Sequence, residues 1–133
     1  MEHEIVVTMT KKYDSNDLSN ILSGALTGCS YWCSDLDFEP DDYKEARKSL
    51  QDKGKTNFCY EDVLVEMLEI GKSLYLDDAE DADEIYELTL EKLLNGIAMN
   101  CEKRPHDCDI DEGDDNTMDC IIQYALFDDV IFC

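Results

Sequence analysis

Residues 60–88 decide the fold of this chain, and they read YEDVLVEMLEIGKSLYLDDAEDADEIYEL. Apolar residues between 63 and 70 recur at helical spacing, which predicts an amphipathic helix closed by Gly71. Residues 72–76 and 85–88 alternate between apolar and polar side chains, and the carboxylate run between them suits a loop. The stretch therefore predicts a helix followed by a β-hairpin.

The same helical periodicity recurs on both sides of this stretch. Residues 17–28 carry one apolar face and follow several side chains that can cap a helix. Residues 89–103 form a clear apolar stripe that stops before Pro105. A last stripe covers 118–126, and a shorter, mostly polar helix is expected over 41–52. Helices therefore dominate the expected structure.

Two further segments are expected to be strands. Ile5–Met9 is short and β-branched, which favours an opening strand, and 130–132 can form a closing strand. Residues 29–42 mix aromatic and acidic side chains and read as an irregular segment with a turn at Pro40. The sum is one α+β domain over residues 1–133, with several helices packed on a small antiparallel β-sheet.

The composition is strongly acidic. The 133 residues include 11 Lys and Arg against 33 Asp and Glu, a formal net charge of -22, yet 44% are hydrophobic, which suits a folded core. This charge repels nucleic acid and anionic membranes, and it attracts basic protein surfaces and divalent cations. The alternative is that the charge serves solubility alone.

The cysteine pattern predicts a reducing compartment. There are seven cysteines, an odd number, and the first ten residues lack the basic and long apolar regions of a secretory signal. No segment has the apolar length of a membrane span. We therefore expect a cytoplasmic protein whose thiols are mostly free.

Acidic side chains concentrate in three runs, and all of these residues except Glu84 are candidate partner-binding residues. The first run comprises Asp35, Asp37, Glu39, Asp41 and Asp42. The second comprises Asp77, Asp78, Glu80, Asp81, Asp83 and Glu84. The third comprises Asp107, Asp109, Asp111, Glu112, Asp114 and Asp115. Duplex DNA carries one charge per about 1.7 Å of axis, so loops of this acidity can imitate it before a basic groove. The alternative is three solvated loops.

The sequence contains only incomplete motifs for calcium and zinc sites. Asp107, Asp109 and Asp111 match the first, third and fifth positions of an EF-hand loop, but Glu112 stands at the glycine position and Met118 at the twelfth. For zinc, Cys29 with Cys33 and Cys101 with Cys108, which bracket His106, lack the usual two-residue spacing. Buried free cysteines are the favoured interpretation, and no metal or cofactor is expected.

Binding is favoured over catalysis. The chain has no phosphate-binding glycine loop, no metalloprotease helix motif and no nucleophile elbow. Tyr31 and Trp32, with Phe38, form an aromatic group among acids that suits either a contact surface or the core. The first two complete the candidate partner-binding set.

Three segments carry a resemblance: LSNILSGALTGCSYWC (18–33), ELTLEKLLNGIAMNCEKRP (87–105) and DCIIQYALFDDVIFC (119–133). They resemble a family of small acidic accessory proteins of phages and prophages whose function is unassigned. Two positions depart from its pattern, because Cys29 follows Gly28 in place of a glycine pair and Asp128 replaces a glycine. The resemblance implies a phage accessory gene and, with it, an anti-defence context, but no site residue.

The leading expectation is a phage-encoded inhibitor of bacterial defence, namely an anti-CRISPR protein that binds a basic nucleic-acid-binding surface of a CRISPR effector nuclease. Its partner is then a basic host-defence protein, with no direct nucleic acid and no membrane. One alternative is a sponge for a nucleotide immune signal, which would use Lys44, Arg47, Lys48 or Arg104. Another is a phage housekeeping or assembly protein.

Overall fold

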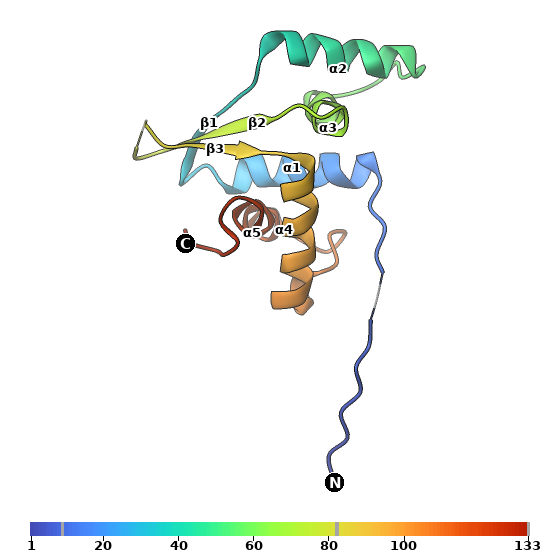
Figure 1. The fold of residues 1–133 in the computed structure, drawn as a ribbon, viewed down its shortest axis with the longest axis vertical. Coiled ribbons are helices and arrows are strands. Elements are labelled where there is room, and N and C mark those ends of the chain that lie inside the picture. The colour runs from blue at the N-terminus through green and yellow to red at the C-terminus, as the bar shows by residue number, and fades with distance from the viewer. Residues whose placement is uncertain (9, 82, 133) are drawn as a thin grey trace.

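A computed structural model describes residues 1–8, 10–81 and 83–132 (Figure 1). Within these residues the elements follow the chain as α1 (Ser15–Gly28), β1 (Cys33–Asp37), α2 (Pro40–Asp52), α3 (Tyr60–Glu69), β2 (Leu74–Asp78), β3 (Ile85–Leu88), α4 (Leu90–Lys103), the short 3-10 turn η1 (Pro105–Asp107) and α5 (Asp115–Phe127). The helices and the small antiparallel sheet confirm the predicted α+β class.

The three strands form one antiparallel sheet in the order β1-β2-β3. The predicted hairpin is β2–β3, in which Leu74 pairs with Leu88 and Leu76 with Tyr86. Strand β1 pairs with β2 on the other side, and the sequence alone did not predict it. Its register shifts between Cys33 and Asp35, so this bulge breaks the alternation by which strands are recognised.

Helices α1, α4 and α5 lie on one side of this sheet and α2 lies toward the other side (Figure 1), and the helices supply most of the core. Helix α5 packs against both α1 and α4, and α3 packs against α1 and α2. Gly96 of α4 permits the close approach to α5, because a Cβ at this position would lie 2.6 Å from the Ile121 carbonyl oxygen. Leu22, Leu64 and Ile121 lie at the centre of the core, each at most 1% exposed.

Acidic side chains begin several of these helices. Asp14 accepts a hydrogen bond from the backbone N–H of Asp17 at α1, and Asp114 accepts one from that of Thr117 at α5. These bonds satisfy amides that have no partner within the helix, and the negative charge suits the positive end of the helix dipole. Part of the acidity thus serves the fold. Over the residues that the structure describes, no helix combines the length and apolar character needed to cross a membrane.

Both predicted terminal strands are wrong. Residues 5–8 have no strand structure and lie in an extended arm, and Met9 is outside the described residues. Residues 130–132 also lie outside any strand. Their backbone is held by a side chain instead, since Gln123 Oε1 accepts hydrogen bonds from the N–H groups of Ile131 (2.9 Å) and Phe132 (2.8 Å).

Candidate functional site

The side of the sheet that faces away from the core carries the candidate site. Because side chains alternate along a strand, Leu36, Leu76 and Leu88 point toward the helices. The opposite side chains form two cross-strand rows, which we call the acidic sheet face: Asp35, Asp77 and Ile85 in one row, and Asp37, Tyr75 and Glu87 in the next. Four of these six side chains are carboxylates, so the sheet presents a flat acidic surface.

Three carboxylates of this face lie unusually close together. Oxygen atoms of Asp35, Asp37 and Asp77 all lie within 4.8 Å of one another. Among the described residues, no lysine, arginine or histidine forms an ion pair with any of them. Moreover, Asp77 Oδ1 is shielded from solvent and has no hydrogen-bond partner among the described residues while the three carboxylates are ionised. The cluster therefore concentrates negative charge that the fold itself does not neutralise.

The crowding perturbs the titration of the cluster. A hydrogen bond with Asp77 raises the pKa of Asp37, and the nearby charges of Asp77 and Asp35 act in the same direction. The physical cause is that like charges at this separation are relieved when one of the carboxyl groups keeps its proton. A cation placed among the three would reverse this effect. Chemically, the cluster can accept one positive group, either a guanidinium or ammonium group of a partner or a divalent cation.

An aromatic patch adjoins this face. The rings of Phe38 and Tyr43 stack at 5.1 Å between centroids, and Tyr60 lies 6.2 Å from Phe38. Burial raises the pKa of Tyr60, and the charges of Tyr43, Glu61, Asp35 and Asp37 raise it further. A cationic side chain that approaches the carboxylates would therefore also meet aromatic rings, which favour cations over their faces.

The rest of the first acidic run lies on α2. Glu39 precedes the helix, and Asp41 and Asp42 lie in its first turn. Asp42 Oδ1 lies 3.6 Å from the Lys72 ammonium, which also contacts Glu45. This half of the run is thus separated from the cluster by the start of a helix and is partly neutralised.

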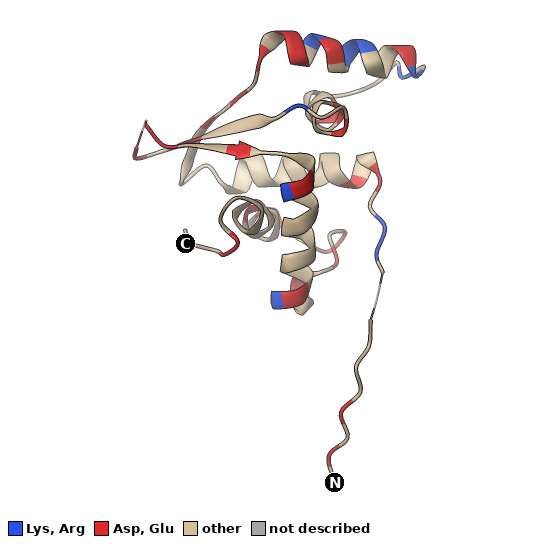
Figure 2. Ribbon diagram, viewed as in Figure 1, with Lys and Arg blue, Asp and Glu red and all other residues tan. Residues whose placement is uncertain are grey.

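The second run forms the turn of the β2–β3 hairpin, which is mostly acidic in Figure 2. Asp78 Oδ1 accepts hydrogen bonds from the backbone N–H groups of Glu80 (2.8 Å) and Asp81 (3.1 Å), and Tyr86 donates to Asp78 Oδ2. These bonds lower the pKa of Asp78. Asp81 in turn accepts from the Asp83 N–H. Carboxylates of the run therefore shape the turn, and the exposed side chains of Glu80, Asp83 and Glu84 add charge near the acidic sheet face.

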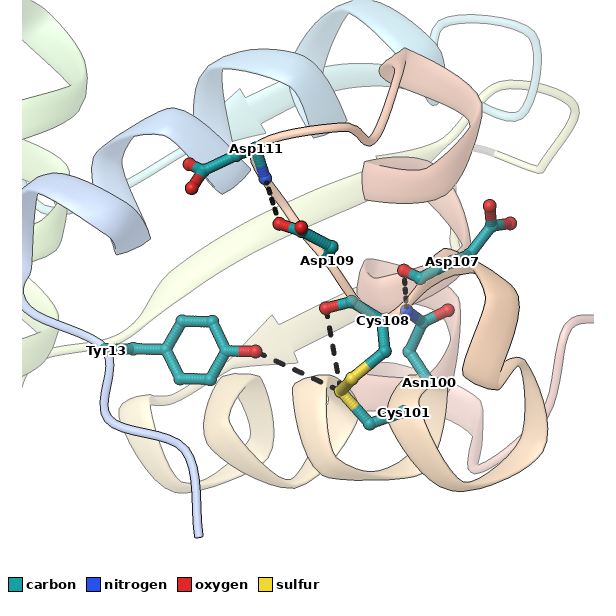
Figure 3. Close-up of a disulfide and its surroundings, with 7 residues drawn as sticks. All are labelled: Tyr13, Asn100, Cys101, Asp107, Cys108, Asp109 and Asp111. Atoms are coloured by element: carbon teal, nitrogen blue, oxygen red, sulfur yellow. Dashed lines mark hydrogen bonds between the residues drawn. A yellow bond between two sulfur atoms is a disulfide. The ribbon is translucent and has the colours of Figure 1, made fainter. Parts of the chain in front are cut away.

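The third run lies between α4 and α5, and several of its carboxylates interact with neighbouring residues in the chain. Asp107 forms an ion pair with Arg104 at 2.6 Å. Figure 3 shows that Asp109 accepts a hydrogen bond from the Asp111 N–H. Asp114 caps α5, Asp115 begins that helix and Glu112 is exposed. The structure does not bring this run into the carboxylate cluster. Of the described residues, the carboxylates with metal-ligand spacing are those of the sheet, not the EF-hand-like positions.

The prediction of free thiols is wrong for two cysteines. Cys101 and Cys108 form a disulfide that links α4 to the segment after η1 (Figure 3). The Tyr13 hydroxyl lies 3.9 Å from Cys101 Sγ. Cys29, Cys33 and Cys120 are free and buried, in agreement with the interpretation of core thiols, and Cys59 is free and exposed. Because zinc binds free thiolates, the disulfide prevents Cys101 and Cys108 from serving as the zinc ligands that the sequence analysis considered.

The two aromatic candidates have different surroundings. Trp32 is only 2% exposed, which favours the alternative of a core residue, and Phe132 stacks on it at 5.0 Å. Tyr31 is half exposed, but its hydroxyl donates to Asp119 at 2.6 Å. Burial, followed by this hydrogen bond, raises the pKa of Tyr31 to about 12. Trp32 therefore offers no face to a partner in this conformation.

The basic residues weighed for a nucleotide site do not converge. Arg104 pairs with Asp107, and Arg47 lies over the Phe58 ring at 5.9 Å. Lys44 and Lys48 are exposed on α2. Of the described pockets, one of about 270 Å³ beside α2 contains Lys53, but that ammonium is bound by Glu66 at 2.6 Å. Nothing in these contacts favours the binding of a phosphate group.

The sequence alone did not identify half of the acidic sheet face. Tyr75, Ile85 and Glu87 belong to it because of the strand register. A signal was present, because the alternation of Leu74 and Leu76 with Tyr75 and Asp77 separates the two faces of β2. The proximity of Asp35 to Asp77 depended on an unpredicted strand.

Comparisons with protein-family models, with curated proteins and with solved structures found no match to this chain.

Proposed function

We propose that the chain is a phage-encoded inhibitor of a bacterial defence system, an anti-CRISPR protein that binds a basic nucleic-acid-binding surface of a CRISPR effector. It acts by binding and not by catalysis, in the cytoplasm of the host bacterium. The phage context rests on the resemblance of its three sequence segments.

The observation that supports this proposal is the carboxylate cluster of Asp35, Asp37 and Asp77. Their oxygen atoms lie within 4.8 Å of one another, and no described cation pairs with them. Assembling like charges without a counter-charge disfavours folding, so the arrangement suits a role outside the monomer. A nucleic-acid-binding channel supplies the missing counter-charges, because it is lined with Lys and Arg.

The surroundings of the cluster fit the same partner. The hairpin turn adds carboxylates, and the patch of Phe38, Tyr43 and Tyr60 adds rings that can stack on guanidinium groups. The net charge of -22 accelerates the approach to a basic surface from a distance. Occupation of the channel would exclude the guide or target strand by competition.

The test is inhibition of target-DNA cleavage by a panel of purified CRISPR effector–guide complexes, followed by binding measurements with each inhibited effector. The informative variant is D35N/D37N/D77N, and its matched control is D109N/D111N/E112Q in the third run. Both variants remove three negative charges. We expect the first to weaken binding about tenfold or more and the second to weaken it only slightly, because remote charges act mainly through long-range steering.

Added salt should slow association with the effector steeply, and nucleic acid bound in the channel should compete. Equal loss in the two variants would leave the acidic sheet face without a special role. Salt-insensitive binding, or binding without competition, would refute mimicry. Release of a nucleotide from the denatured protein would instead support the sponge.

A further inference from the structure

The amino-terminal arm, described over residues 1–8 and 10–13, leaves the folded body at the start of α1 (Figure 1). Three of its apolar side chains are almost fully solvated: Ile5 is 81% exposed, Val6 87% and Val7 72%. Consecutive β-branched residues favour extended pairing with another strand. In the described part of the sheet they have no such partner. The arm therefore presents apolar side chains in an extended conformation suited to strand pairing.

A groove runs between this arm and α4. It has a volume of about 840 Å³, with Val7 and Thr8 on one wall. Leu94, Ile97 and Ala98 of α4 line the other wall, and Leu94 is 44% exposed. An extended chain in this groove would form backbone hydrogen bonds with the arm along one edge, and its side chains would cover the apolar residues of α4.

The charges of the arm identify an occupant. Glu2 and Glu4 stand before the apolar residues, and Lys11 and Lys12 stand after them, as Figure 2 shows. The arm thus has no net charge, whereas residues 14–133 carry 9 basic and 31 acidic residues, a difference of -22. Two such arms are self-complementary when antiparallel, because the acidic end of each lies beside the lysine end of the other. Parallel arms would oppose like charges.

We propose that the groove accepts the arm of a second copy, so that two arms pair antiparallel in a two-fold symmetric dimer. Placing Val6 opposite the partner's Val7 also places Glu2 opposite the partner's Lys11. The contact is isologous, since each arm is at once wall and occupant. Strands rise about 3.3 Å per residue, so the two bodies stand roughly 40 Å apart along the paired arms. At that distance, physiological salt screens their repulsion.

The test is sedimentation equilibrium of the full chain over a range of concentrations at physiological ionic strength. The variant K11E/K12E places two acids beside the acidic end of the partner's arm, with residue 11 directly opposite the partner's Glu2, and we expect its dimer to be about tenfold weaker or more. E2K/E4K/K11E/K12E reverses every charge of the pattern and should restore the dimer to within about threefold of the unaltered chain, because complementarity returns. K44E/K48E on α2 is the matched control, as it changes net charge by the same amount as K11E/K12E and should have a much smaller effect.

Hydrogen exchange of the Ile5–Thr8 amides gives a second readout, and it should slow as the dimer forms. The proposal is overturned if the unaltered chain stays monomeric at every concentration. It is equally overturned if K44E/K48E weakens the dimer as much as K11E/K12E, or if the fourfold reversal fails to restore it. None of these outcomes depends on binding by the acidic sheet face.

Discussion

Carboxylates lie in two contrasting environments in this molecule: Asp119 inside the core, and the cluster of Asp35, Asp37 and Asp77 on the sheet. Asp119 is 1% exposed and accepts hydrogen bonds from Trp32 Nε1 (2.7 Å), the Tyr31 hydroxyl (2.6 Å) and Gln123 Nε2 (3.2 Å). The cluster brings three acids together, and no Lys, Arg or His among the described residues forms an ion pair with them. Buried polar groups need hydrogen-bond partners within the protein, whereas surface groups can bind water or another molecule. The contrast separates a structural carboxylate from binding candidates.

The largest effect should come from Asp119→Ala. The substitution removes the acceptor of the buried Trp32 Nε1, whereas the Tyr31 hydroxyl and Gln123 Nε2 keep the Phe132 carbonyl as an acceptor. A hydrogen bond to a charged group contributes about 1.5–3 kcal/mol, and an unsatisfied buried donor costs about 1–3 kcal/mol. We expect a loss of about 3 kcal/mol in the free energy of unfolding, measured by urea denaturation followed through Trp32 fluorescence and circular dichroism. Glu112→Ala, at an exposed position, is the control and should change it little. A loss below 1 kcal/mol for Asp119→Ala would remove the contrast with the cluster.

Removing carboxylates from the sheet should change the free energy of unfolding in the opposite direction. D35N/D37N/D77N should raise the free energy of unfolding, because it removes repulsion between crowded carboxylates. Like-charged cross-strand pairs are unfavourable by roughly 0.2–1 kcal/mol, so the gain should be on the order of 1 kcal/mol. The same denaturation experiment measures it, with D109N/D111N/E112Q for comparison. A destabilised triple variant would show that the cluster supports the fold.

The pH dependence sharpens the contrast further. Hydrogen bonding with Asp77 raises the pKa of Asp37 above its unfolded value, so the folded protein takes up this proton first as the pH falls. The repulsion is therefore fully present above the raised pKa and fades as the pH falls through it. The advantage of D35N/D37N/D77N should shrink between pH 7 and about 4, as followed by denaturation at each pH.

Other carboxylates behave in the reverse sense. Bonds from the backbone N–H groups of Glu80 and Thr117 lower the pKa values of Asp78 and Asp114, respectively. Their stabilisation is present above the unfolded pKa and is lost as the pH falls through the folded one. Asp78→Asn should therefore be less stable than the unaltered chain at neutral pH, and this difference in the free energy of unfolding should disappear in acid. A difference that does not change with pH would contradict the lowered pKa of Asp78.

Salt should produce the smallest effect. Ions screen exposed charges and reach buried groups far less. Raising the ionic strength should stabilise the unaltered chain by a few tenths of a kcal/mol more than D35N/D37N/D77N, as estimated from cross-strand repulsion. The loss in free energy of unfolding caused by Asp119→Ala should stay constant with ionic strength. Thermal denaturation of the three proteins at a series of salt concentrations measures both effects. A salt-dependent deficit would mean that Asp119 is more accessible than its 1% exposure indicates.

The sequence predicts the helices well because their signals are local. The Asp14 cap, the apolar stripe of α4 and the stop at Pro105 all lie within a few residues of the feature that they control. The hairpin is predicted for the same reason, since β2 and β3 are neighbours in the chain. Of the candidate site, Asp35, Asp37 and Asp77 were predicted as acidic contact residues, but their convergence was not.

The failures occur where distant segments decide the outcome. Cys33 and Leu36 of β1 are the more buried positions of that strand, but the bulge between them hides the period of two. The residues at 130–132 have the composition of a strand, but their backbone is bound by Gln123 of α5. Both outcomes depend on partners that local periodicity cannot identify.

The stacking of Phe132 on Trp32 has a consequence for the order of folding. The two residues are separated by 100 positions (132 minus 32) in the chain, and Phe127 also contacts this tryptophan at 5.7 Å. On the ribosome, the indole cannot be fully covered until residue 132 has been made. Contacts between such distant positions form late, and exposed apolar surface invites aggregation meanwhile. The abundant negative charge of the nascent chain would then keep unfinished copies apart.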